Sequence, residues 1–343
     1  MPAAFLTGGT GFLGWHVAKA LLSEGFRVRA LARGGPDRRT GLEELSVEVV
    51  PGDLSSAAAS DALAGCDAVV HVAGLVKART LADYRAVNVL GTEALLAAAA
   101  AACPAALFVH VSSQAAAGPA KNGRPVREGD PPEPVSWYGI SKLEGERAVA
   151  RAWTGPWIVI RPGVLYGPRD RGLLTYFRMA ESGWVPVPAP NARVQVGPAA
   201  DAALAIARAA ARPDLSGRVG FVCDPEPVRV RELALSIARA GERRARFVSL
   251  PNPLVRLAGA LETAREAVTR ESRPFNADKA REILAGDWLC DPMPLRRDLR
   301  LPSPPPLEDG LKETWAWYRK HGWLSPGGGR SGGGEAGDGA SIL

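Results

Sequence analysis

Two side chains suited to proton transfer, Tyr138 and Lys142, stand four residues apart in the run YGISK. At this spacing both side chains share one face of a helix. A free tyrosine has a pKa of about 10, too high for a base at neutral pH. A neighbouring ammonium group favours the phenolate and lowers that pKa. Lys142 can also hydrogen-bond ribose hydroxyls, so the pair predicts proton transfer beside a bound nucleotide.

A second polar group follows the apolar run 107–111, where Ser112 and Ser113 end a predicted strand. Open α/β sheets bind ligands at the carboxyl ends of their strands. A serine hydroxyl at that place can donate a hydrogen bond to a substrate oxygen or accept one from it.

The run TGGTGFLG at 7–14 lies between a short apolar segment and a helical pattern. In this context Gly8 allows a tight turn, Gly11 lets the backbone approach a pyrophosphate, and Gly14 lets the helix pack close to the strand. The first N–H groups of the helix then point at the phosphates. The spacing is G-x-x-G-x-x-G, which differs from the commoner G-x-G-x-x-G.

Apolar runs alternate with helical patterns through the first half of the chain, which predicts an α/β fold with a doubly wound, Rossmann-type parallel sheet. We expect strands at 4–6, 27–31, 47–50, 68–72, 107–111 and 157–160, and helices at 12–24, 55–64, 82–102 and 138–152. Later segments predict helices at 200–211, 229–240, 254–269 and 307–320 and a strand at 218–223. We therefore divide the chain into a nucleotide-binding domain at 1–165, its sheet completed by later segments, a smaller substrate-binding lobe at 166–323 and a disordered glycine-rich tail at 324–343.

The composition narrows the possible functions. Hydrophobic residues make up 46% and charged residues 23% of the 343, which is ordinary for a soluble protein. The net charge of +6 comes from arginines spread along the chain, without a basic block interleaved with aromatics, so we expect no nucleic-acid partner. Four scattered cysteines and four scattered histidines predict no metal and a cytoplasmic location. The alanine-rich run 94–102 is about half the length of a membrane span, so we expect no integral membrane segment, and no secretory signal.

Together these motifs strongly resemble the extended short-chain dehydrogenase/reductase family, the NAD(P)-dependent epimerases and dehydratases, over about residues 3–320. The resemblance rests on TGGTGFLG, PGDL (51–54), VVHVAG (69–74), VNVLGTEALL (87–96), VHVSS (109–113), YGISK (138–142) and RPGVLYGP (161–168). It implies that Ser113, Tyr138 and Lys142 are catalytic and that Asn88 is a structural or relay residue. The resemblance favours Ser113 over Ser112 as the catalytic serine, because Ser113 lies five residues before Gly118. The cofactor-binding residues that it implies are Gly8, Thr10, Gly11, Phe12, Leu13, Gly14, Arg33, Asp53, Leu54, Ala73, Gly74, Tyr138, Lys142, Pro162 and Val164.

The end of the second predicted strand indicates which cofactor is preferred. NAD-specific relatives usually place an acidic residue there, whereas this chain reads RALAR at 29–33. Arg33 could contact a 2′-phosphate bidentately, so we expect NADP(H) to be preferred, with NAD(H) possible. Arg38 or Arg39 could supply that contact instead.

Three functions remain open. The favoured one is an oxidoreductase that interconverts a secondary alcohol and a ketone by hydride transfer, with tyrosine as acid and base. The chain departs from the sugar-nucleotide pattern in SQAAAGP (113–119) and PAAD (198–201), which makes a nucleotide-sugar epimerase or dehydratase the alternative. A non-catalytic NADP-binding sensor or scaffold is the third.

The second half of the chain bears on the substrate and on assembly. The segment 173–187 and the helix 254–269 offer apolar surface for a pocket wall that suits a small, apolar substrate, although that helix could equally pack on the core. The wall would include Leu173, Leu174, Phe177 and Trp184. The resemblance also implies a homodimer, joined through the helices 82–102 and 138–152.

Overall fold

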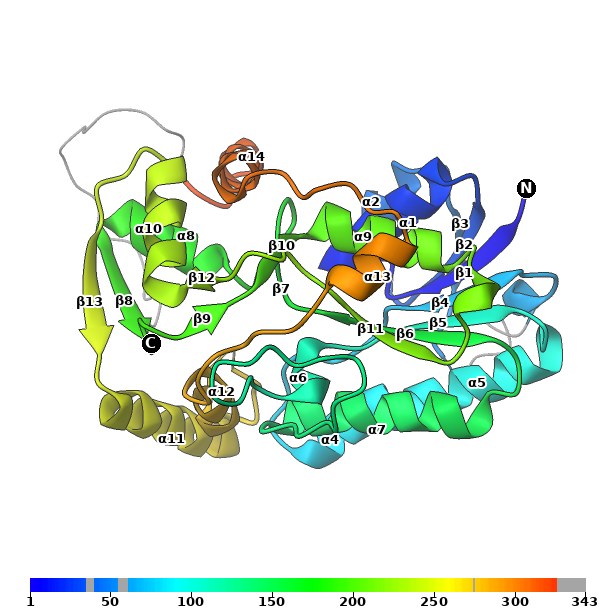
Figure 1. Cartoon of the computed structure of the whole chain (residues 1–343), viewed down its shortest axis with the longest axis horizontal. Coiled ribbons are helices and arrows are strands. Elements are labelled where there is room, and N and C mark those ends of the chain that lie inside the picture. Colours follow the sequence, from blue (N-terminus) through cyan, green and yellow to red (C-terminus); the bar gives the residue numbers. More distant parts are fainter. Residues whose placement is uncertain (35–39, 55–60, 274, 326–343) are drawn as a thin grey trace.

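A seven-stranded parallel sheet forms the centre of the computed structural model, which describes residues 1–34, 40–54, 61–273 and 275–325 (Figure 1). The strand order is β11-β6-β5-β4-β1-β2-β3. The strands are β1 (Ala3–Thr7), β2 (Arg27–Ala32), β3 (Glu48–Pro51), β4 (Ala68–His71), β5 (Leu107–Val111), β6 (Trp157–Pro162) and β11 (Arg218–Val222). This arrangement confirms the predicted fold class.

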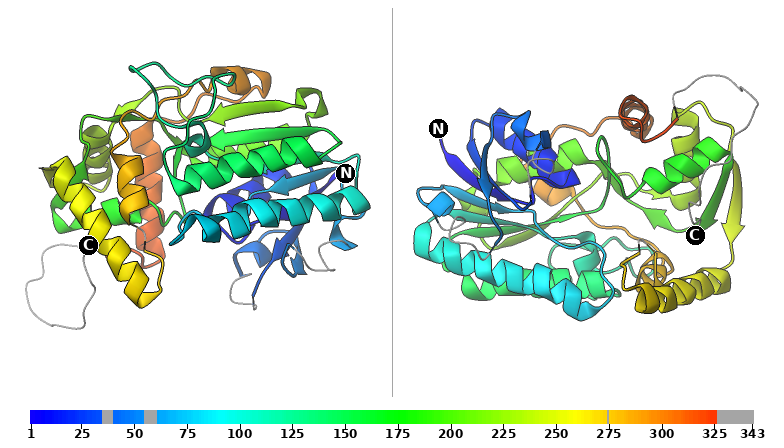
Figure 2. Two further views of the ribbon diagram at one scale, coloured as in Figure 1. Left: turned by 90° about the horizontal axis from the view of Figure 1, so that it is seen from below. Right: turned by 180° about the vertical axis from the view of Figure 1, so that it is seen from behind.

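Side chains alternate between the two faces of the sheet, and each face has its own core. Ala4 and Leu6 of β1 pack with α1 (Phe12–Ser23), α9 (Ala199–Ala209) and α13 (Met293–Asp298). Ala3 and Phe5 of the same strand pack on the other face, under α5 (Gly91–Ala102) and α7 (Trp137–Ala152). Helices therefore cover both faces, as buried parallel strands require (Figure 2).

A further core lies beyond the sheet, at the opposite end of the molecule (Figure 1). It is built around the buried aromatic side chains Phe177, Trp315 and Tyr318. Its helices are α8 (Leu174–Ser182), α10 (Val230–Ala240) and α14 (Leu307–Lys320), and its strands include β8 (Trp184–Pro188) and β13 (Arg246–Leu250). Leu324, expected in the tail, is buried in this core, whereas 326–343 lie outside the described residues.

The remaining elements are short, apart from one long helix. They are α2 (Thr40–Glu43), α4 (Leu81–Arg85), α6 (Gln114–Ala117), α12 (Ala277–Ile283), β7 (Val164–Tyr166), β9 (Arg193–Val194), β10 (Val196–Pro198), β12 (Val228–Arg229), the π-helical turn η2 (Ala86–Leu90) and the 3-10 turn η3 (Pro213–Leu215). The long helix is α11 (Asn252–Thr269), which packs against α12 at one edge of the molecule (Figure 2).

One predicted helix is longer than expected, and another is described only in part. The helix expected at 82–102 is continued back to Leu81 through α4 and η2, which gives 22 helical residues, and its most apolar 18-residue window has a mean hydropathy of 1.2. By length and composition alone this stretch could cross a membrane, but its residues Leu95, Leu96 and Ala99 pack into the core under the sheet. Of the helix expected at 55–64, residues 55–60 lie outside the described residues and 61–63 are helical.

Candidate active site

The carboxyl ends of the parallel strands bring the glycine turn to the point where the strand order reverses. Gly8, after β1, has a φ of +75°, and a Cβ there would lie 2.6 Å from the backbone nitrogen of Ala73, which follows the neighbouring β4. A Cβ on Gly14 would lie 2.0 Å from the carbonyl oxygen of Gly8. Only glycine fits these two places, and crevices at such reversals are where open α/β sheets bind ligands.

The amino end of α1 fits a dinucleotide phosphate group. Gly11 occupies the N-cap without a side-chain hydrogen bond, and the first turn carries no acidic residue. Thr10 and Gly11 are exposed, and Phe12 and Leu13 are half-buried. No side chain caps the N–H groups of this turn, and they lie at the positive end of the helix dipole. This environment favours a pyrophosphate.

The other predicted cofactor-binding residues lie at the same edge. Arg33 is exposed directly after β2, and Asp53 is exposed and Leu54 half-buried just after β3. Ala73 and Gly74 follow β4, Pro162 ends β6 as a buried residue, and Val164 begins β7. Arg38 and Arg39 lie outside the described residues. The edge of the sheet therefore carries all of the predicted positions that the structure describes.

Tyr138 lies in the first turn of α7, and Ser113 lies close enough to its hydroxyl to act on its pKa. Ser136 caps the helix by accepting a hydrogen bond from the Gly139 N–H at 3.1 Å. Burial raises the pKa of Tyr138 to about 12, against the effect of Ser113. The expected lowering of this pKa is therefore wrong for the protein by itself, because loss of hydration outweighs the effect of Ser113.

Lys142 lies one helical turn later, buried, with its Nζ donating to the Val111 carbonyl oxygen at 2.7 Å. A Cβ placed on Gly74 would lie 3.5 Å from this Nζ, so the ammonium group lies beside Gly74. Burial lowers the pKa of Lys142 to about 8, while the nearby Glu146 carboxylate raises it. The ammonium group is thus held in place at the strand ends, beside the glycine that follows β4.

Ser112 and Ser113 have different roles in the structure. The Ser112 hydroxyl donates to a carboxylate oxygen of Glu146, which also accepts two hydrogen bonds from Arg161 at 2.8 and 2.7 Å. All three side chains are buried. Ser113 instead caps α6, accepting from the Ala115 N–H at 3.1 Å, and contacts Tyr138. The geometry therefore favours Ser113 as the residue that faces a substrate.

Asn88 is buried in the π-helical turn η2 and joins two parts of the site. Its side-chain oxygen accepts from the Leu75 N–H at 2.7 Å. Its Nδ2 donates to the Leu75 carbonyl oxygen at 3.0 Å and to the Ser141 hydroxyl at 2.9 Å. These bonds connect the loop after β4 to the helix that carries Tyr138 and Lys142.

Sequence reasoning missed the contribution of α12, which lies against the start of α7. Both carboxylate oxygens of Asp278 accept from the Trp137 N–H, at 2.9 and 3.0 Å. Glu282 accepts a hydrogen bond from Ser136 at 2.9 Å and acts to raise the pKa of Tyr138. These contacts join residues about 140 positions apart, and no motif in the sequence predicts them.

The predicted apolar pocket wall is wrong in most of its residues. Leu174 and Phe177 are buried in the core of the second half of the chain, and Leu173 packs against it. Trp184 is 55% exposed, and the leucines of α11 face solvent. Leu173, Leu174 and Phe177 therefore pack within the chain and do not line a pocket. α12 covers the opposite face of α11.

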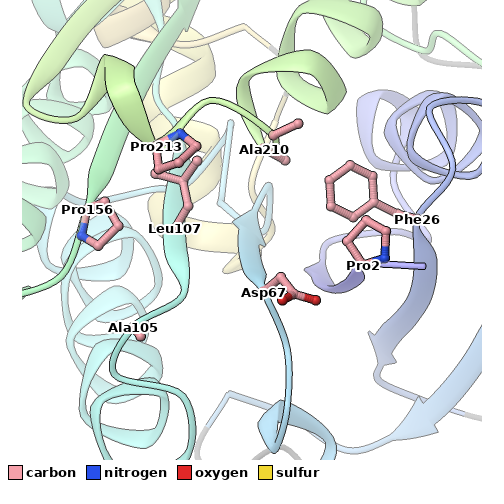
Figure 3. A pocket seen from close by; sticks show the side chains of 9 residues that line it. Pro2, Phe26, Asp67, Ala105, Leu107, Pro156, Ala210 and Pro213 are labelled. Carbon is pink, nitrogen blue, oxygen red and sulfur yellow. The ribbon is translucent and has the colours of Figure 1, made fainter.

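A hollow of about 340 Å³ lies at the other edge of the sheet (Figure 3). Pro2, Asp67, Leu107 and Pro156 line it, at the amino ends of the strands or just before them. It is therefore remote from Tyr138 and is not the candidate active site. Among the described residues no group of three or more histidine, cysteine, aspartate or glutamate side chains could hold a metal ion.

Comparison with known proteins shows what the whole chain is similar to. Residues 4–219 match the model of the NAD dependent epimerase/dehydratase family. Ceramide reductase of Caulobacter vibrioides is 36% identical over 321 residues, 93% of this chain and 95% of that protein. The 4-hydroxy-2-methyl-3-oxo-4-farnesyl-3,4-dihydroquinoline-1-oxide ketoreductase of Stigmatella aurantiaca is 36% identical over 180 residues, 50% of this chain and 52% of that protein.

A solved structure extends the likeness to the whole fold. UDP-glucuronic acid 4-epimerase from Bacillus cereus, in complex with NAD, superposes with a TM-score of 0.74 at 18% identity, covering 93% of this chain and 99% of that one. At this identity the likeness concerns the fold alone. The family match and the near full-length relative together show that the chain belongs to the NAD-dependent epimerase/dehydratase family, within the extended short-chain dehydrogenases/reductases, whose members include NAD(P)-dependent reductases and epimerases.

Proposed function

We propose that this protein is an NADP(H)-dependent reductase that interconverts a ketone and a secondary alcohol on an apolar substrate. The observation that carries the proposal is that Ser113 and Tyr138 lie close together, with the buried ammonium of Lys142 one helical turn after Tyr138. These groups lie at the edge of the sheet where the glycine turn and α1 fit a dinucleotide.

Ser113, Tyr138 and Lys142 each have a separate role in the proposed carbonyl reduction. Ser113 donates a hydrogen bond that holds and polarises the substrate carbonyl oxygen. Tyr138, whose pKa of about 12 keeps it protonated at neutral pH, gives its phenolic proton to that oxygen. Lys142 stabilises the phenolate that remains, because an opposite charge nearby favours the ionised form. A bound nicotinamide supplies the hydride in this direction and accepts it in the reverse one.

Two features of the relatives support an apolar ketone as the substrate. The relative from Caulobacter vibrioides is named a ceramide reductase, and ceramide is a lipid. The relative from Stigmatella aurantiaca is named a ketoreductase of a ring compound that carries a farnesyl group. This chain also departs from the sugar-nucleotide pattern at 113–119. We therefore expect the carbonyl group of a lipid or isoprenoid compound to bind beside Ser113.

The test is NADPH oxidation with a long-chain 3-oxo lipid and with an isoprenoid ketone, together with a separate assay for epimerisation of a UDP-sugar. Tyr138→Phe should lower the rate about 10²–10⁴-fold while leaving NADPH binding nearly intact. Tyr84→Phe is the matched control, since the Tyr84 ring lies 6.0 Å from that of Tyr138 but its hydroxyl donates to the Val76 carbonyl oxygen. Turnover of the UDP-sugar with internal recycling of the cofactor would favour an epimerase instead. Normal turnover by Tyr138→Phe would remove this tyrosine from the mechanism.

We also propose a cytoplasmic homodimer. All four cysteines are free and buried, and the sulfur atoms of Cys223 and Cys290 lie 3.5 Å apart without a bond, which suits a reducing compartment. Only 28% of the most apolar window of the helix Leu81–Ala102 is buried in one chain, so a partner helix could cover the rest. We place cofactor binding in residues 1–165 together with β11, and substrate binding in 166–323.

A further inference from the structure

Helix α11 exposes its large apolar side chains to solvent. Leu254, Leu257, Leu261 and Val268 are 55%, 56%, 62% and 84% exposed. With 3.6 residues per turn, these positions form one stripe along the helix. The opposite face of α11 is the buried one, with Val255, Gly259, Glu262 and Glu266. We name the stripe of Leu254, Leu257, Leu261 and Val268 the α11 apolar face.

The two glutamates of α11, Glu262 and Glu266, are turned inward by specific partners. Glu266 accepts a hydrogen bond from the Arg273 N–H at 2.6 Å and faces the Asn276 amide. Glu262 forms an ion pair with the Arg273 guanidinium at 3.4 Å. Gly259 lets the helix approach α12 so closely that a Cβ there would lie 2.8 Å from that of Ala280. Packing against α12 and its leading loop therefore sets the orientation that leaves the leucines outside.

Most exposed charged residues near α11 in the sequence are arginines, of which Arg265 pairs with Glu262 at 3.8 Å. The exposed charged residues between 244 and 273 are five arginines and one glutamate: Arg244, Arg246, Arg256, Arg265, Arg270 and Glu271. The neighbouring strands add two exposed apolar side chains, Trp184 of β8 and Val248 of β13. The guanidinium of Arg246 lies over the Trp184 ring, 5.6 Å from its centre. A helix with exposed leucines on one face and exposed arginines is typical of helices that lie in the interface of an anionic membrane.

We propose that the α11 apolar face docks the protein peripherally on a bilayer that contains anionic phospholipid. The leucine side chains would enter the acyl boundary while the arginines bind lipid phosphates. A soluble protein partner with an apolar groove would not need this excess of arginines, whereas an anionic lipid surface matches it. α11 lies at the edge of the molecule, so a flat surface can reach it (Figure 1).

Docking at this place would bring the membrane close to the candidate active site. α11 packs on α12, and α12 supplies Asp278 and Glu282 to the start of the helix that carries Tyr138. Two helices thus separate a docked bilayer from the catalytic tyrosine. Membrane binding does not depend on the proposed reaction and can be measured without substrate or cofactor.

The test is flotation of the full chain with vesicles of phosphatidylcholine mixed with phosphatidylglycerol, compared with vesicles of phosphatidylcholine alone. The protein should float with the anionic vesicles, and added salt should weaken the binding. Leu257→Glu should lower the partition coefficient about tenfold to a hundredfold, the cost of keeping one leucine out of the apolar phase. Met293→Glu on α13 is the matched control, because Met293 is also exposed, at 53%, but lies outside this face. The control should float like the unmodified protein.

Two further measurements test the role of the arginines and the oligomeric state. Arg256→Glu should reduce binding to the anionic vesicles and make it less dependent on salt. Light scattering without vesicles should give the same mass for Leu257→Glu as for the unmodified protein. Failure of the unmodified protein to float, or undiminished flotation of Leu257→Glu, would overturn the proposal. Halving of the mass by Leu257→Glu would overturn it too, because the face would then join two copies of the chain.

Discussion

Glu146 and Arg161 form a bidentate ion pair inside the protein, with both side chains only about one-twentieth exposed. The pair crosses from α7 to β6 and also accepts the hydroxyl hydrogen bond of Ser112. It therefore ties the helix of Tyr138 to the strands beneath it. The neighbouring Ser113 takes no part in this pair and caps α6 instead.

Glu146→Ala should destabilise the fold by about 3–5 kcal/mol, because Arg161 would remain charged and buried without its partner. Urea unfolding measures the loss. Glu144→Ala is the control, since Glu144 forms an exposed ion pair with Arg85 and should cost no more than about 1 kcal/mol. Equal losses in the two variants would mean that the buried pair contributes little.

The two directions of the proposed reaction should respond oppositely to pH. Ketone reduction uses protonated Tyr138 and charged Lys142, so kcat/KM should be flat below about pH 8 and fall above it as Lys142 loses its proton. Alcohol oxidation needs Tyr138 deprotonated and should rise with pH. Initial rates measured in both directions test this, and parallel profiles would contradict it.

Lys142 should also affect stability in a pH-dependent way. Burial lowers its pKa from 10.5 to about 8 in the folded chain, so between these values the unfolded chain binds more protons. Stability from this group therefore rises with pH across that window, by up to about 3 kcal/mol. Lys142→Met should abolish turnover, yet be more stable than the unmodified protein at pH 7. Urea titrations at pH 7 and at pH 10 compare the two proteins, and a less stable Lys142→Met would contradict the expectation.

Arg33 should determine the preference for NADPH. If it contacts the 2′-phosphate, NADPH should bind more tightly than NADH by about 1.5–3 kcal/mol, roughly ten- to a hundredfold in Kd. Arg33→Ala should weaken NADPH alone, and Ala32→Asp should reverse the preference, because a carboxylate accepts from a ribose hydroxyl but repels a phosphate. Calorimetric titration with both cofactors measures the difference. Equal affinities in the unmodified protein would refute this assignment.

The proposed dimer should depend on the outer side of the helix Leu81–Ala102. Leu90 is 60% exposed there, and Ala97, Ala100 and Ala101 are exposed along the same helix. Leu90→Glu should therefore convert a dimer into a monomer at micromolar concentration, measured by light scattering. If the unmodified protein is a monomer, the proposal is wrong and the alanine run serves only to favour the helix.

Much of the sheet could be predicted because buried parallel strands are continuous apolar runs, as at 107–111 and 157–160. The glycine turn was predictable since Gly8 and Gly14 have no room for a side chain. The orientation of α11 was not. Its periodicity defines two faces, but only contacts with Arg273, Asn276 and α12 determine which one is covered. The role of Asp278 depends on similar long-range packing.

The edge strand β11 affects how the chain can be cut into fragments. It pairs with β6 from Arg218 to Val222, more than fifty residues after β6 ends. A fragment that stops at residue 165 would keep every predicted cofactor contact but would leave the N–H and C=O groups of β6 unpaired along one side. Such a bare strand is a template for association between chains, so this fragment should aggregate, whereas one that ends after 222 keeps the edge covered. Attempts to isolate the nucleotide-binding half should therefore place the boundary after β11.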